Sequence, residues 1–294
     1  MTNIDLLYTG LERLPDVGEE LYSEDFSLQL GGGLPGMLIH LSRLGVPVKL
    51  ATALGDDLFS AFAREEYRKN GINPENFDNG SGFPVNVTSA MVLPHDRSFV
   101  TYGNGMMEAD DDAKERFYTM AHGAKITLMQ PDGYLEVYRK LHDEGTLLLL
   151  DTSWDDELSI EKYREYLTVA DYYTPNRKEA LRLTGAATVD DAAEQLQAFF
   201  EKPVIKLDKD GCLGIENGKK TVVPPLDVTA VDTTGAGDAF LAGFAYGLFE
   251  GEPFERCLLY GNITGGSCVT KVGALSAVIT KEELHRIAKG GAYE

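Results

Sequence analysis

The sequence contains few cysteines, fewer basic than acidic residues and no long apolar run. Its three cysteines form no Cys-x-x-Cys pair, so we expect buried thiols in a reducing compartment instead of disulfides or a zinc site. Lysine and arginine number 27 against 47 acidic residues, and the net charge of −20 makes nucleic acid and anionic membranes unfavourable partners. The longest apolar stretches, such as 147–150 and 239–249, fall short of the roughly 18 residues of a membrane span. Residues 1–10 lack a signal-peptide pattern, and we expect a cytoplasmic protein.

Several common catalytic motifs are missing as well. The sequence has no H-E-x-x-H, G-x-S-x-G or G-x-x-x-x-G-K-[ST], which leaves zinc proteases, serine hydrolases and P-loop enzymes without support. Its five histidines show no i, i+4 pairing, so we expect structural or exposed roles for them.

From about residue 31 the chain alternates apolar strands with amphipathic helices. This alternation predicts an α/β fold with a central, mostly parallel sheet and helices on both faces. We expect strands at 48–54, 125–130, 146–151, 171–174 and 203–207. We expect helices at 37–44, 58–70, 135–144, 160–170, 178–184, 190–201 and 239–249.

Two segments depart from this plan. Residues 21–30 end in a polar–apolar alternation, and residues 86–102 carry β-branched and aromatic side chains around a Pro-His-Asp turn at 94–96. Such patterns are typical of half-exposed antiparallel strands. We therefore predict that the two segments pair in a small sheet, a lid formed by about residues 6–30 and 84–103.

The segment Asp232–Phe240 reads D-T-T-G-A-G-D-A-F and opens an apolar helix after a β-like stretch at 221–231. Gly235, Ala236 and Gly237 leave backbone N–H groups uncovered at the helix N-terminus, where the positive end of the dipole favours phosphate. Asp238 falls in the first turn, where a carboxylate can accept the proton of an attacking hydroxyl. The alternative explanation is a structural glycine turn before a helix, but such a turn would not require two Asp, two Thr and Gly-Ala-Gly together. Positioning, charge neutralisation and a base are what phosphoryl transfer requires.

This segment resembles the C-terminal signature of the ribokinase, or PfkB-type, carbohydrate kinases. The resemblance extends over nearly the whole chain and implies a three-layer α/β/α sandwich with a small β-sheet lid, in a single kinase domain over residues 1–294. It implies ATP-dependent phosphorylation of a hydroxyl on a small sugar or sugar-like molecule. In that family Asp238 would be the catalytic base, and Gly235, Ala236 and Gly237 would hold the transferred phosphoryl group.

Motifs near the N-terminus are similar to the family's substrate site. Asn3-Ile4-Asp5 resembles its N-x-D, in which the Asp binds sugar hydroxyls, and residues 14–19 (L-P-D-V-G-E) resemble the turn before the lid. Residues 31–36 (G-G-G-L-P-G) resemble the N-terminal signature, except that Gly36 stands where relatives carry a sugar-binding Asn. The resemblance assigns substrate contacts to Asp5, Gly32, Gly33, Gly36 and Asn104.

The nucleotide and metal residues are also assigned by resemblance. Asn176 and Glu179 match an N-x-x-E that holds Mg²⁺, although a capping box explains the same spacing. Nucleotide contacts fall on Asn176, Lys206, Asp208, Gly211 and Asn262, with a departure near Gly211 from the family's T-x-G. Asp232, Thr234 and Ser276 resemble a monovalent-cation site, so K⁺ is a possible cofactor together with ATP and Mg²⁺. Arg97 lies on a predicted lid strand, where it is equally well explained as a solvent-exposed charge or as a substrate contact.

Two other functions remain open at this point. Gly31, Gly33 and Gly36 satisfy G-x-G-x-x-G with Asp56 twenty residues on, which indicates an NAD-linked oxidoreductase. Against it, the preceding strand alternates instead of being continuously apolar. A non-catalytic sugar- or nucleotide-binding protein on the same fold is the second alternative.

Relatives carry a full strand before N-x-D, whereas only Met1 and Thr2 precede Asn3 here. We expect either numbering from an internal point or a shortened inner strand, and lower stability if the strand is absent. The lid has edges and one face to cover, so a homodimer through the lid is possible. The acidic composition favours a neutral substrate.

Overall fold

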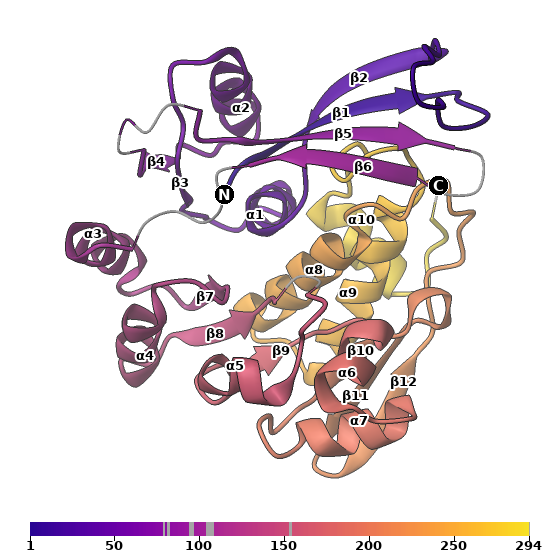
Figure 1. Ribbon diagram of the computed structural model, residues 1–294. Helices are drawn as coiled ribbons and strands as arrows, with labels where there is room; N and C mark the ends of the chain where they lie inside the picture. Colours follow the sequence, from indigo (N-terminus) through magenta and orange to yellow (C-terminus); the bar gives the residue numbers. More distant parts are fainter. Residues whose placement is uncertain (79, 81–82, 94–96, 104–108, 153–154, 294) are drawn as a thin grey trace.

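The computed structural model describes residues 1–78, 80, 83–93, 97–103, 109–152 and 155–293. Strands and helices alternate along most of these ranges, as the sequence predicts (Figure 1). The strands are β1 (Asn3–Thr9), β2 (Asp25–Leu30), β3 (Ala51–Thr52), β4 (Glu75–Asn76), β5 (Asn86–Val92), β6 (Arg97–Tyr102), β7 (Ile126–Met129), β8 (Leu147–Leu150), β9 (Tyr172–Tyr173), β10 (Val204–Lys206), β11 (Cys212–Glu216) and β12 (Lys219–Val223). The helices are α1 (Leu34–Arg43), α2 (Leu58–Lys69), α3 (Asp111–Ala121), α4 (Leu135–Asp143), α5 (Ile160–Leu167), α6 (Arg177–Thr184), α7 (Val189–Leu196), α8 (Ala236–Glu250), α9 (Phe254–Cys268) and α10 (Lys281–Ala288), with a short 3₁₀ turn η1 (Asp208–Asp210).

The central sheet is built around parallel strands. β7, β8 and β9 pair in parallel, with Ile126 opposite Leu147 and Leu150 opposite Tyr173. A parallel bridge between Asn176 and Lys206 connects the end of β9 to β10, and β10, β11 and β12 continue as antiparallel strands. The carboxyl ends of β8, β9 and β10 therefore meet along one edge of the sheet.

Side chains from successive strand residues enter two different cores. Leu148 and Leu150 pack with α4, α5, α6 and α7, whereas Leu149 packs with α1, α8, α9 and α10. Because alternate residues of a strand face opposite sides, these two clusters place helices on both faces of the sheet. The predicted α/β/α sandwich is confirmed (Figure 1).

A separate four-stranded sheet has the order β2-β1-β5-β6. β2, from the segment 21–30, and β5 and β6, from the segment 86–102, share this sheet, as predicted, but β2 pairs with neither β5 nor β6 in the described ranges. β1 lies between β2 and β5, with Ile4 opposite both Leu30 and Val87. Asn3 and Asp5 lie within β1 itself, so in this chain N-x-D is part of a strand of the four-stranded sheet. The predicted turn at 94–96 lies outside the described residues.

Several predicted strands are shorter in the structure. The stretch 48–54 forms only β3, and the β-like stretch 221–231 is a strand only as far as Val223. Pro224 and Pro225 follow, and proline cannot donate to a strand ladder. Helix α8 begins at Ala236, before the apolar residues that suggested a start at 239. No helix in the described ranges is long and apolar enough to cross a membrane.

Candidate active site

Asp238 lies in the first turn of α8, at the end of the signature segment. The helix is preceded by Gly235 in the left-handed conformation (φ 76°), and a Cβ there would lie 2.5 Å from the Cβ of Ala274. Only glycine suits both conditions. The Ala236 N–H donates to the Thr233 carbonyl at 3.3 Å. N–H groups in the first turn of a helix lack intrahelical acceptors, so Gly237 is the better donor to an anion at this end of α8.

The glycine loop after β2 contacts Asp238 directly. The Gly33 N–H donates to Oδ2 of Asp238 at 2.6 Å, and a Cβ on Gly32 would lie 2.2 Å from the same oxygen. Asp238 keeps partial access to solvent. The pKa of Asp238 is raised to about 6, mainly by burial among protein atoms and next by the charge of Asp151. The Gly33 N–H and the charge of Lys206 act in the opposite direction. A carboxyl group of this kind is suited to proton transfer near neutral pH.

Asp5 lies on the other side of the same loop. It is 7% exposed, and the Asn3 side-chain amide donates to its Oδ1 at 2.6 Å, while the Thr88 hydroxyl donates to Asn3 Oδ1 at 3.1 Å. Burial is the main cause that raises the pKa of Asp5 to about 6. A Cβ on Gly31 would lie 2.9 Å from Asp5 Oδ1, so residues 31–33 run between two acids.

Lys206 lies beside the start of α8. A Cβ on Gly237 would lie 3.1 Å from its Nζ, which places an ammonium group next to the N-terminal N–H groups of the helix. A positive side chain and a helix N-terminus together form a favourable site for phosphate oxygens. Lys206 ends β10 at the carboxyl edge of the sheet, where α/β folds bind ligands.

Asn176 and Glu179 form a reciprocal capping box at the start of α6. The Glu179 N–H donates to Asn176 Oδ1 at 2.9 Å, and the Asn176 N–H donates to Glu179 Oε2 at 2.8 Å. The geometry thus confirms the capping explanation of this spacing. Glu179 still contributes negative charge at the site, since it helps raise the pKa of Asp238.

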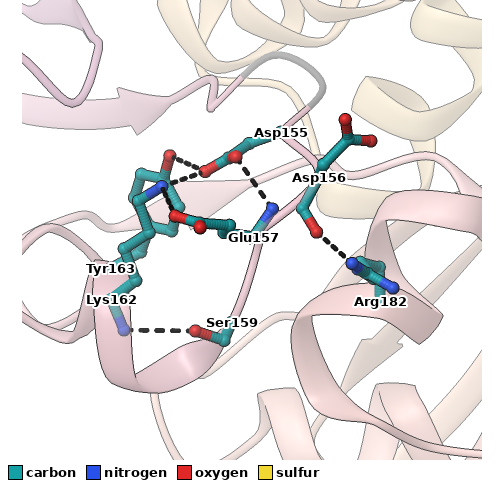
Figure 2. A network of polar contacts seen from close by, with 7 residues as sticks. All are labelled: Asp155, Asp156, Glu157, Ser159, Lys162, Tyr163 and Arg182. Atoms are coloured by element: carbon teal, nitrogen blue, oxygen red, sulfur yellow. Dashed lines mark hydrogen bonds and ion pairs between the residues drawn. The ribbon is translucent and has the colours of Figure 1, made fainter.

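Asp151, whose charge helps raise the pKa of Asp238, is an acidic residue near the candidate site that the sequence analysis did not single out. It directly follows β8, and its signal was its place as the first polar residue after a buried apolar strand of a parallel sheet. A polar network beyond it fixes the start of α5, in which Asp155 accepts from Lys162 at 2.7 Å and from the Tyr163 hydroxyl at 2.6 Å (Figure 2). Arg182 of α6 donates to the Asp156 carbonyl in the same network.

Three predicted nucleotide residues have structural contacts. Asp208 is exposed and lies 3.8 Å from Arg177. Gly211 has φ 87°, and a Cβ there would lie 2.1 Å from the Val223 carbonyl, so a tight turn requires glycine. Asn262 is buried and donates to the carbonyls of Val223 and Pro224 at 2.9 and 2.8 Å, which holds the chain after β12.

The residues expected to bind a monovalent cation are engaged with other protein groups. Asp232 Oδ1 accepts from the Thr234 N–H and hydroxyl, and its Oδ2 accepts from the Gly273 N–H. Burial opposes ionisation of Asp232, but these donors and Arg97 outweigh it and lower its pKa. Arg97 lies 3.6 Å from Asp232, so the suggestion of a merely solvated charge is wrong.

The Ser276 hydroxyl donates to Gln29 Oε1 at 3.0 Å, and that oxygen lies beside Gly273, whose N–H donates to Asp232. Gly36 lies buried in α1, and Asn104 lies outside the described residues. In the described part of the chain, no three His, Cys, Asp or Glu side chains cluster as metal ligands. A Mg²⁺ ion here would need water and phosphate oxygens besides protein carboxylates, as Mg²⁺ commonly does.

In this α/β/α sandwich the N-terminus of α8, Lys206 and Asp238 converge at the carboxyl edge of the sheet. This arrangement is the architecture of a small-molecule phosphotransferase. The chain matches the model of the pfkB family of carbohydrate kinases over residues 2–281. It belongs to that family, and it is accordingly a carbohydrate kinase.

Curated relatives align with most of its length at low identity. Ribokinase from Bacillus subtilis is 26% identical, covering 97% of this chain and 96% of the relative. An ATP-dependent ribose-1-phosphate kinase from Halopiger xanaduensis is 29% identical, covering 91% and 89%.

Solved structures confirm the ribokinase-like fold. Ribokinase from Giardia lamblia aligns with a TM-score of 0.84 at 19% identity, covering 98% of this chain and 96% of that one. Arabidopsis thaliana ribokinase complexed with ribose and ATP aligns with a TM-score of 0.81 at 23% identity, again covering 98% and 96%.

The interpretation of residues 31–36 as a dinucleotide fingerprint fails on the topology. That fingerprint follows a strand of a parallel βαβ unit. Here the preceding strand, β2, is an edge strand among those that the structure describes, and it pairs with β1 in antiparallel orientation. The N–H at Gly33 is directed at Asp238 instead.

Proposed function

We propose that the protein transfers the γ-phosphoryl group of ATP to a hydroxyl of a neutral sugar, with Asp238 as the general base. The observation that carries this proposal is the position of Asp238. Its carboxylate lies at the N-terminus of α8 and contacts the glycine loop beside Asp5. Its pKa of about 6 leaves it largely ionised at neutral pH, yet basic enough to accept a proton.

The sugar would lie against the glycine loop. Asp5 can accept hydrogen bonds from two sugar hydroxyls, and Asn3 fixes its orientation. Gly32 and Gly33 let the substrate approach the backbone, and the missing side chain at Gly36 enlarges the same region. Two carboxylates beside the loop would repel an anionic substrate, which favours a neutral pentose or hexose.

ATP would lie along the C-terminal half, its phosphates directed at Gly235–Gly237 and at Lys206. Asn176, Asp208, Gly211 and Asn262 lie along the same half and remain proposals for nucleotide contacts. Mg²⁺, held through water near Glu179 and Asp151, would neutralise charge on the transferring phosphoryl group. Asp232, Thr234 and Ser276 remain the candidate K⁺ ligands. Three buried free thiols suit a reducing compartment such as the cytoplasm.

We further propose that residues 1–294 act as one kinase domain in which the four-stranded sheet is the lid. Closing it over the sugar would exclude water and suppress ATP hydrolysis. The lid exposes large apolar side chains at Phe26, Phe99, Val100 and Tyr102, which favours a homodimer formed through it. Light scattering at micromolar concentration tests this part, and a monomer would refute it.

The deciding experiment is an ADP-release assay with Mg·ATP over sugars, sugar phosphates and nucleosides. We expect turnover with a neutral sugar and a loss on the order of 10²–10⁴ in kcat for Asp238→Asn, the range typical of a general base. Asp143→Asn, which alters an exposed acid on α4, is the matched control and should keep full activity. Near-normal turnover of folded Asp238→Asn would reject the mechanism. ATP binding without turnover of any substrate would favour a non-catalytic binding protein.

A further inference from the structure

Segment 273–277, which follows α9, packs against the turn that begins α8. The Gly273 N–H donates to Oδ2 of Asp232 at 2.8 Å, which holds the first residue of the signature segment. The next residue, Ala274, is buried, and a Cβ on Gly235 would lie 2.5 Å from the Cβ of Ala274. Because the two parts are closely packed, a displacement of segment 273–277 would displace the start of α8 as well.

His40 of α1 contacts segment 273–277 at Ala274. His40 is buried, and its Nε2 lies 3.3 Å from the carbonyl oxygen of Ala274. Burial lowers the pKa of His40 to about 4, so the ring is neutral at pH 7 and carries a single N–H. A carbonyl oxygen can only accept, so Nε2 is the donor in this contact. His40 therefore fixes the orientation of the peptide group after Ala274.

Arg43 lies three residues later on the same face of α1 and contacts the rest of the segment. Its Nη1 donates to the carbonyls of Leu275 and Ala277 at 2.8 and 3.4 Å. Its Nε donates to Asn70 Oδ1 at 2.9 Å, and burial lowers its pKa despite the charge of Glu66. Removing a guanidinium from water to bond neutral oxygens is unfavourable, so fold stability alone does not explain an arginine here. The planar guanidinium does hold several oxygens in a fixed geometry.

The other end of α1 serves the opposite side of the site. The helix begins at Leu34, directly after Gly33, whose N–H donates to Asp238. One helix therefore carries the glycine loop at its first residue and holds segment 273–277 by its last turn. Its 10 residues span about 15 Å as a stiff rod. The helix thus fixes the separation between the loop proposed to bind the sugar and the turn proposed to bind phosphate.

We propose that His40 and Arg43 are positioning residues for phosphoryl transfer. They hold segment 273–277 against the start of α8, and so keep the glycine turn and Asp238 at the correct distance from the attacking hydroxyl. Both act through the segment and not by contact with sugar or ATP. The inference rests on the proposed function, since it concerns the geometry of that transfer.

The test compares Arg43→Met with Arg256→Met. Arg256 is the matched control because it is also half-buried and donates to a backbone carbonyl, that of Ala288, at 2.9 Å. Both variants lose such contacts, so both should have a lower Tm. The ADP-release assay is run well below either Tm, with Mg·ATP and the panel sugar of highest kcat/KM. We expect kcat of Arg43→Met to fall by about 10²-fold, as for a misplacement of about 1 Å, with both KM values little changed. Arg256→Met should keep the kcat of the unchanged protein.

Two further readouts follow the segment itself. Amide exchange at Gly273 should become faster in Arg43→Met and not in Arg256→Met. His40→Gln should keep about tenfold more kcat than His40→Leu, because the glutamine amide can still donate to the Ala274 carbonyl.

An unchanged kcat in Arg43→Met would overturn the proposal, and so would equal losses in the two methionine variants, which would reflect stability alone. A lower kcat with unchanged exchange at Gly273 would show that Arg43 does not act through the segment. If Arg43→Met does not fold, the two His40 variants decide, and equal kcat values for them reject the proposal. If the unchanged protein phosphorylates nothing in the panel, the proposed function itself fails. Normal turnover that these variants leave intact rejects only the positioning role.

Discussion

Asp238 and Gly33 are 205 residues apart in the sequence and are joined by a hydrogen bond of 2.6 Å from the Gly33 N–H to Oδ2 of Asp238. The bond connects the start of α8 to the loop that leaves β2. It orients one carboxylate oxygen and stabilises its ionised form, which partly offsets the effect of burial on its pKa. The proposed base is thus positioned by the four-stranded sheet as well as by its own helix.

The pH dependence of activity should follow the ionisation of Asp238. A base must be unprotonated, and the pKa of Asp238 is raised from 3.8 to about 6. We therefore expect kcat/KM to be constant above about pH 7 and to fall by about tenfold per unit at low pH. Because the pKa of Asp5 is also about 6, the profile must be repeated with Asp5→Asn. If the acidic limb disappears in Asp5→Asn, then Asp5 and not Asp238 controls it.

Asp238→Asn should be more stable than the unchanged protein at neutral pH. The folded-state pKa of Asp238 lies above its unfolded value, so between about pH 4 and 6 the native state binds more protons than the unfolded state. The free energy of unfolding therefore decreases as the pH rises through this window. We expect Asn to recover up to about 3 kcal/mol at pH 7, from roughly two pKa units, and little at pH 4. Urea unfolding at both pH values measures the difference. A variant less stable at pH 7 would contradict the assignment.

Gly32→Ala should impair catalysis with limited effect on binding of ATP. The added Cβ would lie 2.2 Å from Asp238 Oδ2, so the carboxylate must move. A displacement of about 1 Å can reduce the rate by about 10²-fold. Gly36→Ala is the comparison variant, because its Cβ, on α1, would lie 3.3 Å from the Gly31 carbonyl and would not meet Asp238, so its effect should fall on KM for the sugar and not on kcat. Steady-state kinetics should separate the two variants, and equal losses in kcat would show that displacement of Asp238 is not the cause.

Lys206→Met should weaken ATP binding and shift the pH profile. The ammonium group lies beside Gly237, and its charge lowers the pKa of Asp238. Its removal should raise KM for ATP by about tenfold, the order expected for one charge-assisted contact to phosphate, and should move the acidic limb to higher pH. Lys209→Met changes an exposed lysine three residues on and serves as the control. An unchanged KM and an unchanged limb in Lys206→Met would place the phosphates elsewhere.

The sequence predicted the elements whose patterns are local. The apolar run of β8 and the signature segment at the start of α8 can be recognised without knowing what they pack against. Both lie close to where the sequence predicted them. The pairing of β1 between β2 and β5 was not predictable, because register across 80 residues depends on packing with Ile4 and Val87 that no local pattern encodes. Asp151 was missed for a similar reason, since its effect on Asp238 arises only when two distant strand and helix ends converge.

The glycine loop also links the position of the four-stranded sheet to the environment of Asp238. Residues 31–33 directly follow β2, so movement of the four-stranded sheet would carry Gly33 away from Asp238. Water would then reach the carboxylate, and because burial is the largest cause of its raised pKa, hydration would lower that pKa more than loss of the Gly33 N–H would raise it. The proposed base would be both less well oriented and a weaker proton acceptor with the sheet displaced, so proton transfer and closure of the site would be linked.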